Sequence, residues 1–274
     1  METIISLTPT GLIPTREITP HVPVTPEEII NDVVRCHAIG ITTVHIHARG
    51  QDGGPTYQKE IYARIISGIR ERIPDLIICV SASGRTFPEF EKRSDVLNLG
   101  SDTKPDMASL LLGSVDFREG TSLNPPDTVI RLAEKMNERG IKPELEVFDI
   151  GMMNFARYLI EKGLLTPPYY FNIILGNLTS AGLKLHHLAA ILQDLPDDSC
   201  WSLGGIGVSQ LQAHMIAIAL GGGVRLGIED NIWYDQKKTC LATNEELVRR
   251  ITQIIHMNDK TVMLPKEFRK FLGI

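Results

Sequence analysis

Short apolar runs alternate with helical patterns along the whole chain, and this alternation predicts its architecture. Eight runs are predicted strands, at residues 4–8, 42–47, 76–81, 107–111, 144–148, 171–175, 199–203 and 224–227. Eight β-α repeats in a chain of 274 residues favour a closed parallel barrel over an open sheet. We therefore expect one α/β domain over residues 1–274, a (β/α)8 TIM barrel with a short C-terminal helix.

Several of the intervening helices carry clear start and stop signals. Residues 25–28 read as a capping box with proline at the first helical position, and Gly40 ends the helix that follows. Residues 124–127, Asn-Pro-Pro-Asp, are expected to open a second helix, which Gly140 closes, and residues 243–246 to open a third. No linker, repeat or low-complexity tract divides the chain into separate units.

Composition narrows the function classes. The chain is 43% hydrophobic and 22% charged, as soluble globular proteins are, so disorder is not expected. A formal net charge of -5 gives no electrostatic reason to expect a nucleic-acid partner. No apolar run is long enough to cross a membrane, and the N-terminus does not resemble a secretory signal.

The cysteines point to a reducing compartment. They are widely scattered, without CxxC spacing, at Cys36, Cys79, Cys200 and Cys240. A disulfide framework or a structural zinc ribbon is therefore not expected. We predict reduced, mostly buried thiols in a cytoplasmic protein.

The strongest chemical signal is a pair of histidines at the end of the second predicted strand. Residues i and i+2 of a strand face the same side, so His45 and His47 can reach one ion. Glu229 and Asp230 follow the eighth strand, and parallel strands in a barrel end at a common rim. Two imidazoles and one carboxylate form a catalytic zinc set, although iron, cobalt, nickel or manganese also fit.

The two adjacent carboxylates could have different chemical roles. Because the side chains of Glu229 and Asp230 diverge, one can bind the metal while the other acts as a base. Arg225 and the ion would set the proton affinity of that base. The alternative is an ordinary strand end followed by a solvated turn.

Two loops could bind anions. Residues 81–84, Ser-Ala-Ser-Gly, offer hydroxyls and free backbone N–H groups that suit a carboxylate. Residues 204–207, Gly-Gly-Ile-Gly, precede a predicted helix whose N-terminus favours anions. Serine and glycine are also common in turns, so turn formation alone explains both loops equally well.

These features, in this order, resemble the β-keto acid cleavage enzymes. The matching stretches are residues 22–28, 44–49, 104–109, 144–148, 204–207 and 229–231, which span nearly the whole chain. The resemblance implies a zinc-dependent barrel that condenses a β-keto acid with acetyl-CoA, giving acetoacetate and a new acyl-CoA. It also implies a homo-oligomer, in this family a tetramer.

The resemblance assigns roles to individual residues. Those matching the metal ligands are His45, His47 and Glu229. Those matching the acid/base group, its supporting arginine and a further acidic residue are Asp230, Arg225 and Glu146. Those matching the substrate-carboxylate site are Ser81, Gly84 and Ser109, the last in place of a threonine.

Besides Ser109, three positions depart from the family pattern. Ile13 stands where a glutamate pairs with the ammonium group of an aminated substrate. An apolar side chain leaves that ammonium unpaired, so we expect an uncharged or apolar β-keto acid instead. Val208 replaces an arginine that often follows Gly-Ile-Gly, which weakens the case for CoA use, and Ser83 replaces a glycine.

Two other functions are compatible with part of this pattern. Amidohydrolases also have a metal-bound barrel, but they place the His-x-His pair after strand 1 and further ligands after strands 4 to 6. Here the pair follows the second strand, and no lysine or histidine ends strands 4 to 6. A non-catalytic metal-binding or ligand-binding relative is the other alternative, although simple metal binding does not require Asp230 beside Glu229.

Overall fold

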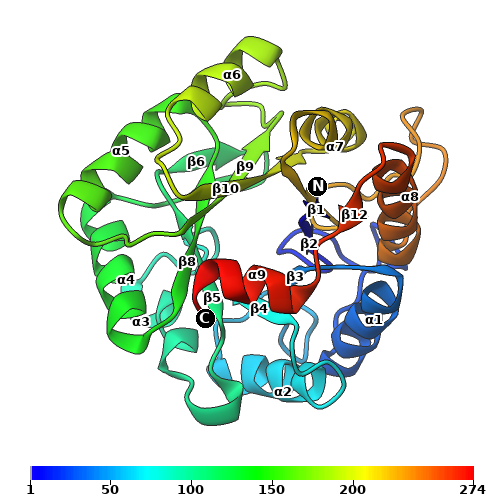
Figure 1. Cartoon of the computed structure of the whole chain (residues 1–274). Coiled ribbons are helices and arrows are strands. Elements are labelled where there is room, and N and C mark those ends of the chain that lie inside the picture. The colour runs from blue at the N-terminus through cyan, green and yellow to red at the C-terminus, as the bar shows by residue number, and fades with distance from the viewer. Residues whose placement is uncertain (1) are drawn as a thin grey trace.

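The computed structural model describes residues 2–274 and confirms the predicted barrel. Eight parallel strands close in the order β2-β3-β4-β5-β8-β9-β10-β11, so consecutive barrel strands pair with each other (Figure 1). The strands are β2 Ile5–Leu7, β3 Thr43–Ile46, β4 Ile77–Val80, β5 Met107–Leu111, β8 Lys142–Val147, β9 Tyr169–Leu175, β10 Ser199–Gly205 and β11 Gly223–Leu226. Each of them overlaps one predicted apolar run.

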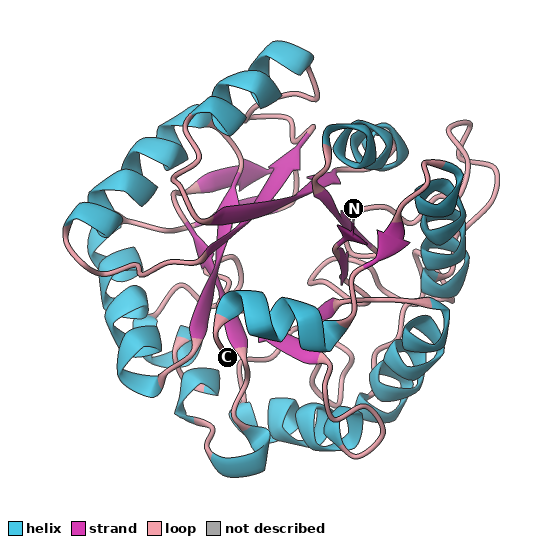
Figure 2. Cartoon of the chain, viewed as in Figure 1, coloured by secondary structure: helices cyan, strands magenta, loops and turns pink. Residues whose placement is uncertain are grey.

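A helix follows each barrel strand and packs on the outside of the barrel (Figure 2). The helices are α1 Pro26–Ile39, α2 Lys59–Arg70, α3 Phe90–Arg93, α4 Pro126–Arg139, α5 Ile150–Glu161, α6 Leu185–Gln193, α7 Ser209–Leu220 and α8 Asn244–Met257. Two short 3-10 turns, Val96–Asn98 and Ser101–Thr103, precede β5. Among residues 2–274, every helix is too short or too polar to span a bilayer.

The three predicted helix starts are confirmed, and α4 begins at Pro126 within the predicted residues 124–127. Thr25 and Thr243 cap α1 and α8, and both hydrogen bonds of the capping box form in each case. Asn124 itself does not cap α4, whose N-cap is Pro125. The Asn124 side-chain oxygen instead accepts a hydrogen bond of 2.6 Å from the buried guanidinium of Arg93, which links this segment to the loop after β4.

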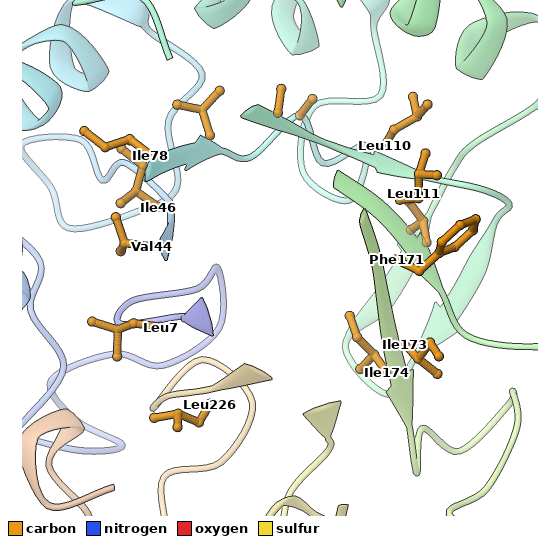
Figure 3. Packing of buried hydrophobic residues seen from close by; sticks show 14 of the residues in the cluster. Leu7, Val44, Ile46, Ile78, Leu110, Leu111, Phe171, Ile173, Ile174 and Leu226 are labelled. Carbon is orange, nitrogen blue, oxygen red and sulfur yellow. The ribbon is translucent and has the colours of Figure 1, made fainter. Parts of the chain in front are cut away.

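The main hydrophobic core lies between the barrel and its helices. In β3, Val44 and Ile46 point outward into this layer, and Figure 3 shows them beside Ile78 of β4. Burial of each such side chain stabilises the fold by roughly 1.5–3 kcal/mol. Because side chains alternate along a strand, the same burial directs His45 and His47 into the barrel.

The two ends of the barrel differ. The C-terminal helix α9, Pro265–Leu272, crosses the N-terminal end of the barrel (Figure 1). Phe268 and Leu272 of α9 pack against Tyr170 and other side chains inside that end. Beside it, β1 Glu2–Thr3 pairs with β12 Thr261–Val262. The opposite, C-terminal rim remains for the polar groups.

A small hairpin at that rim was not predicted. Strands β6 Val115–Phe117 and β7 Gly120–Ser122 pair antiparallel within the connection from β5 to α4. The hairpin turn consists of Arg118 and Glu119, and both side chains line the central cavity described below.

Candidate active site

The three predicted metal ligands meet at the C-terminal rim. Their ligand atoms all lie within 4.8 Å of one another. His47 Nε2 lies 3.3 Å from His45 Nε2 and 3.3 Å from Glu229 Oε1. Four-coordinate zinc at about 2.0–2.1 Å from nitrogen and oxygen requires its ligand atoms to lie about 3.3 Å apart. The spacing therefore fits a zinc-sized cation.

The hydrogen-bonding state of these residues supports the same fit. Glu229 Oε2 and His47 Nδ1 are buried and have no hydrogen-bond partner in the described chain. Burial lowers the pKa of His47, which favours the neutral imidazole that binds metals. Burial would raise the pKa of Glu229, but His47 and Arg225 outweigh burial and hold it well below its usual range. Glu229 is therefore a charged candidate ligand at neutral pH.

A buried carboxylate that the sequence analysis did not assign fixes the orientation of His45. Glu144 Oε2 lies 2.6 Å from His45 Nδ1, and the Glu144 side chain is fully buried. Burial disfavours imidazolium, yet Glu144 outweighs burial and raises the pKa of His45 to about 9. With Nδ1–H held by Glu144, His45 presents Nε2 toward His47. This is the carboxylate–histidine arrangement that commonly supports bound metals.

Two neighbours hold Glu144 in turn. Asn172 Nδ2 donates to Glu144 Oε1 at 3.0 Å, and Cys79 Sγ donates to Oε2 at 3.3 Å. The sequence did contain a signal for this layer. Glu144 alternates with Glu146 along β8, so both face the barrel interior, and Asn172 lies on the adjacent strand β9.

Arg225 on β11 joins three carboxylates at one point. Its Nε donates to Asp230 Oδ2 at 2.8 Å, its Nη2 to Glu229 Oε1 at 2.8 Å, and its Nη1 to Glu146 Oε1 at 3.2 Å. The arginine side chain is only 3% exposed, so these charge-assisted bonds are sheltered from solvent. Arg225 therefore fixes the positions of the candidate ligand Glu229 and of Asp230 relative to each other.

The environment separates the pKa values of these carboxylates. Burial raises the pKa of Asp230 above its ordinary value although Arg225 opposes it. Burial raises the pKa of Glu146 to about 7, again against Arg225. Glu229, by contrast, stays ionised. Neighbouring carboxyl groups with different proton affinities can divide metal binding from proton transfer.

A cavity of about 740 Å³ opens over these groups. Its walls include all three candidate ligands together with Arg225, Asp230 and Glu146. A larger cavity of about 1050 Å³ lies beside α1 and α2, and none of these six residues lines it. The chemistry is therefore concentrated in the smaller cavity.

The residues expected to bind substrate divide into two sets. Ile13, Ser81 and Ser83 line the cavity. Ser109 and Gly84 are not among its lining residues. Ser109 Oγ instead accepts a hydrogen bond of 3.1 Å from the backbone N–H of Ala82, and Gly84 packs under the carbonyl of Leu123. Ser109 and Gly84 thus support the shape of the serine loop from behind.

Buried arginines anchor the loops around the cavity. Arg93 donates to the Ala82 carbonyl at 2.8 Å and the Leu123 carbonyl at 2.9 Å. Arg49 donates to the carbonyls of Gly11, Pro14 and Gly53 at 2.9–3.1 Å. Through Gly11 and Pro14, Arg49 fixes the segment that carries Ile13.

Comparison with known proteins agrees with this geometry. The family model for beta-keto acid cleavage enzymes matches residues 2–274. The chain is 33% identical over 273 residues to a 3-keto-5-aminohexanoate cleavage enzyme of Fusobacterium nucleatum subsp. nucleatum, covering 99% of this chain and 97% of the relative. It is 34% identical over 274 residues to a 3-oxoadipate:acetyl-CoA acetyltransferase of Cupriavidus necator, covering 99% of this chain and 94% of the relative.

Solved structures support the fold. The apo structure of ObcA superposes with a TM-score of 0.81 at 21% sequence identity, covering 93% of this chain. This chain spans 66% of the ObcA chain.

Proposed function

This chain belongs to the beta-keto acid cleavage enzyme family, and we propose that it is a zinc-dependent transferase acting on a β-keto acid and acetyl-CoA. The C2–C3 bond of the keto acid breaks, and C2 forms a bond to the acetyl carbonyl carbon. The acyl group from C3 onward passes to the CoA sulfur. The products are acetoacetate and a new acyl-CoA, so no external oxidant or reductant is needed.

One observation carries the proposal: candidate metal ligands and a separate proton carrier share one cavity. A cation held by His45, His47 and Glu229 would polarise the keto group and stabilise negative charge developing there. Asp230 takes or returns the proton at C2, and Arg225 holds its carboxylate in place at 2.8 Å. The Ser81 and Ser83 hydroxyls, in the same wall, bind the carboxylate next to C2.

The lining of the cavity bears on the choice of substrate. Ile13 lines the cavity with an apolar side chain, at the position where the family pattern has a glutamate that pairs with the ammonium group of an aminated substrate. Burial of an unpaired ammonium costs several kcal/mol, so we propose a substrate without an amino group.

Acetyl-CoA must be held without the arginine that the family often has after Gly-Ile-Gly. Val208 occupies that position at the N-cap of α7 and is 41% exposed. The relative from Cupriavidus necator is named for acetyl-CoA, which supports retention of this co-substrate. We therefore propose that CoA makes its contacts through other residues of the rim.

The proposal is tested with the zinc-loaded protein, acetyl-CoA and a panel of short, long, dicarboxylic and aminated β-keto acids. Acetoacetate and an acyl-CoA should form together from at least one acid, and only when acetyl-CoA is present. Absence of product across the panel would contradict the proposed activity and favour a non-catalytic binding protein. The variant Asp230→Asn should retain zinc and lose turnover, whereas Asp127→Asn, at an exposed position of α4, should behave as wild type.

We also propose that several copies of the chain assemble. Leu185 of α6 and Leu220 of α7 line one surface pocket, and they are 69% and 58% exposed. Contiguous exposed apolar surface commonly marks contacts between subunits. Light scattering should give a multiple of 30.4 kDa, and a monomeric mass would contradict this proposal.

A further inference from the structure

Two cations in the cavity wall, Arg85 and Arg118, have no role in the reaction described so far, and Arg118 is exposed at the hairpin turn whereas Arg85 is mostly buried. Arg85 lies in the loop after β4, and its side chain is only 13% exposed. It lines the same cavity as the three candidate ligands. Its guanidinium carbon lies 4.3 Å from the ring centroid of Phe117, and its Nη2 lies 3.3 Å from Glu119 Oε2. Both contacts come from the β6–β7 hairpin.

Most of the hydrogen-bonding capacity of Arg85 is unused. A guanidinium has five N–H donors, and in residues 2–274 the contact with Glu119 is the one side-chain hydrogen bond that Arg85 makes. Its Nε is buried and has no hydrogen-bond partner in the part of the chain that the structure describes. Arg49 and Arg93, which are also buried at this rim, direct every guanidinium nitrogen to an acceptor.

Unpaired donors on a buried cation favour an anionic ligand. A buried donor without a partner destabilises the folded protein, and more so when it is charged. Glu119 compensates little, because its side chain is 54% exposed and the contact is long for a charge-assisted bond. A carboxylate inside the cavity would satisfy Arg85 better than this solvated partner does.

A carboxylate bound by Arg85 would lie at a different place from the carboxylate next to C2, which the serine hydroxyls bind. Ser81, Ser83 and His47 also line a small adjoining cavity, and Arg85 does not. The hydroxyls therefore sit on the side of the metal ligands, whereas Arg85 faces the hairpin. One elongated substrate can place a carboxylate at each position.

We infer that Arg85 binds a second carboxylate, at the distal end of the keto acid, so that the substrate is a dicarboxylic β-keto acid. The inference rests on the proposed function and names its substrate class. It replaces the sequence-based expectation of an uncharged or apolar substrate. It agrees with Ile13, whose apolar side chain in the same cavity disfavours an ammonium group.

The test compares 3-oxoadipate with 3-oxohexanoate, which has the same chain length and no distal carboxylate. Arg85→Met should lower kcat/KM for 3-oxoadipate roughly 10- to 100-fold, as expected for one charge-assisted contact, and change that for 3-oxohexanoate less than about threefold. Arg85→Lys should retain part of the preference. Glu119→Gln, which removes the competing carboxylate, should lower the KM for 3-oxoadipate.

Arg131→Met is the matched control. Arg131 lies on α4, its guanidinium carbon is 3.7 Å from the Phe90 ring centroid, and it pairs with Glu91 at 3.5 Å. It reproduces the arginine–phenylalanine–glutamate arrangement away from the cavity. This variant should leave both substrates unaffected.

Calorimetric binding of 3-oxoadipate to the zinc-loaded protein without acetyl-CoA gives a readout independent of turnover. Arg85→Met should weaken that binding. Equal losses for both keto acids would assign Arg85 to the carboxylate next to C2 and overturn the inference. A loss confined to the KM for acetyl-CoA would assign Arg85 to a CoA phosphate and also overturn it. Wild-type inactivity toward every acid, with 3-oxoadipate binding that depends on Arg85, would refute the proposed function alone.

Discussion

Replacement of Glu144 by glutamine should weaken metal binding while leaving the barrel intact. Glu144 receives hydrogen bonds from His45, Asn172 and Cys79 at 2.6, 3.0 and 3.3 Å. Glutamine has nearly the same shape but one acceptor oxygen and no charge. If that oxygen keeps the His45 and Cys79 contacts, the new NH2 group faces Asn172. Asn172 Oδ1 is buried without a partner among the described residues, so a flip of its amide satisfies the new donor.

The expected magnitude follows from the loss of charge alone. Removal of a carboxylate that orients a metal-bound histidine typically costs 10–100-fold in affinity, or about 1.4–2.7 kcal/mol. Zinc affinity is measured by competition with a chromophoric chelator at fixed pH. Thermal unfolding of the metal-free protein checks that the fold is retained.

Glu138→Gln is the control, because Glu138 lies on α4 with its side chain 67% exposed. It should bind zinc as the wild type does. If Glu144→Gln binds zinc within a factor of two of wild type, Glu144 does not orient a metal ligand, and the assignment of His45 loses its main support.

Three further perturbations test separate parts of the site. Gly11→Ala should lower zinc affinity at least tenfold, because the φ angle of Gly11 is +64° and the added Cβ would lie 2.6 Å from Glu229 Cγ. Gly182→Ala is the control, because a Cβ added there would meet no atom within 4 Å. Burial lowers the pKa of His214 from 6.5 to about 4, so this residue contributes about 3 kcal/mol of stability above pH 6.5 that is lost as the pH falls toward 4. Denaturant unfolding of His214→Gln should show a weaker pH dependence across that window, and an unchanged dependence would contradict the assignment. Arg225→Lys should reduce kcat at least 100-fold, since one ammonium cannot hold three carboxylates in fixed directions, and near wild-type turnover would argue against the positioning role.

The barrel could be predicted because its determinants are local. In β3, Val44 and Ile46 alternate with His45 and His47, which identifies a strand and also assigns its two faces. The capping boxes at Thr25 and Thr243 fix helix starts through contacts three residues apart. Repetition of such units along the chain then leaves the closed barrel as the simplest arrangement.

The supporting layer of the site could not be predicted in the same way. An acidic residue in a strand, such as Glu144, ordinarily indicates a solvent-exposed face, and its role depends on His45, 99 residues away in sequence. Asn124 has the residue type of a helix cap, yet its side chain pairs with Arg93. In both cases a long-range contact outweighs the local preference.

The rim hairpin shows a second limit. Strands β6 and β7 have three residues each, with a charged turn and little apolar periodicity. Their sequence is typical of a surface loop. The importance of the hairpin lies in what it places beside Arg85, namely Phe117 and Glu119, and only the folded chain reveals that arrangement.

We propose that His45, His47 and Glu229 hold one divalent ion on which β-keto acid cleavage depends. Acetoacetate release by the metal-depleted protein, measured before and after zinc is restored, tests this dependence. With an accepted keto acid and acetyl-CoA, the depleted protein should form no acetoacetate, and activity should return and saturate at one zinc per chain. Full turnover by protein shown to be free of divalent metal would contradict the account.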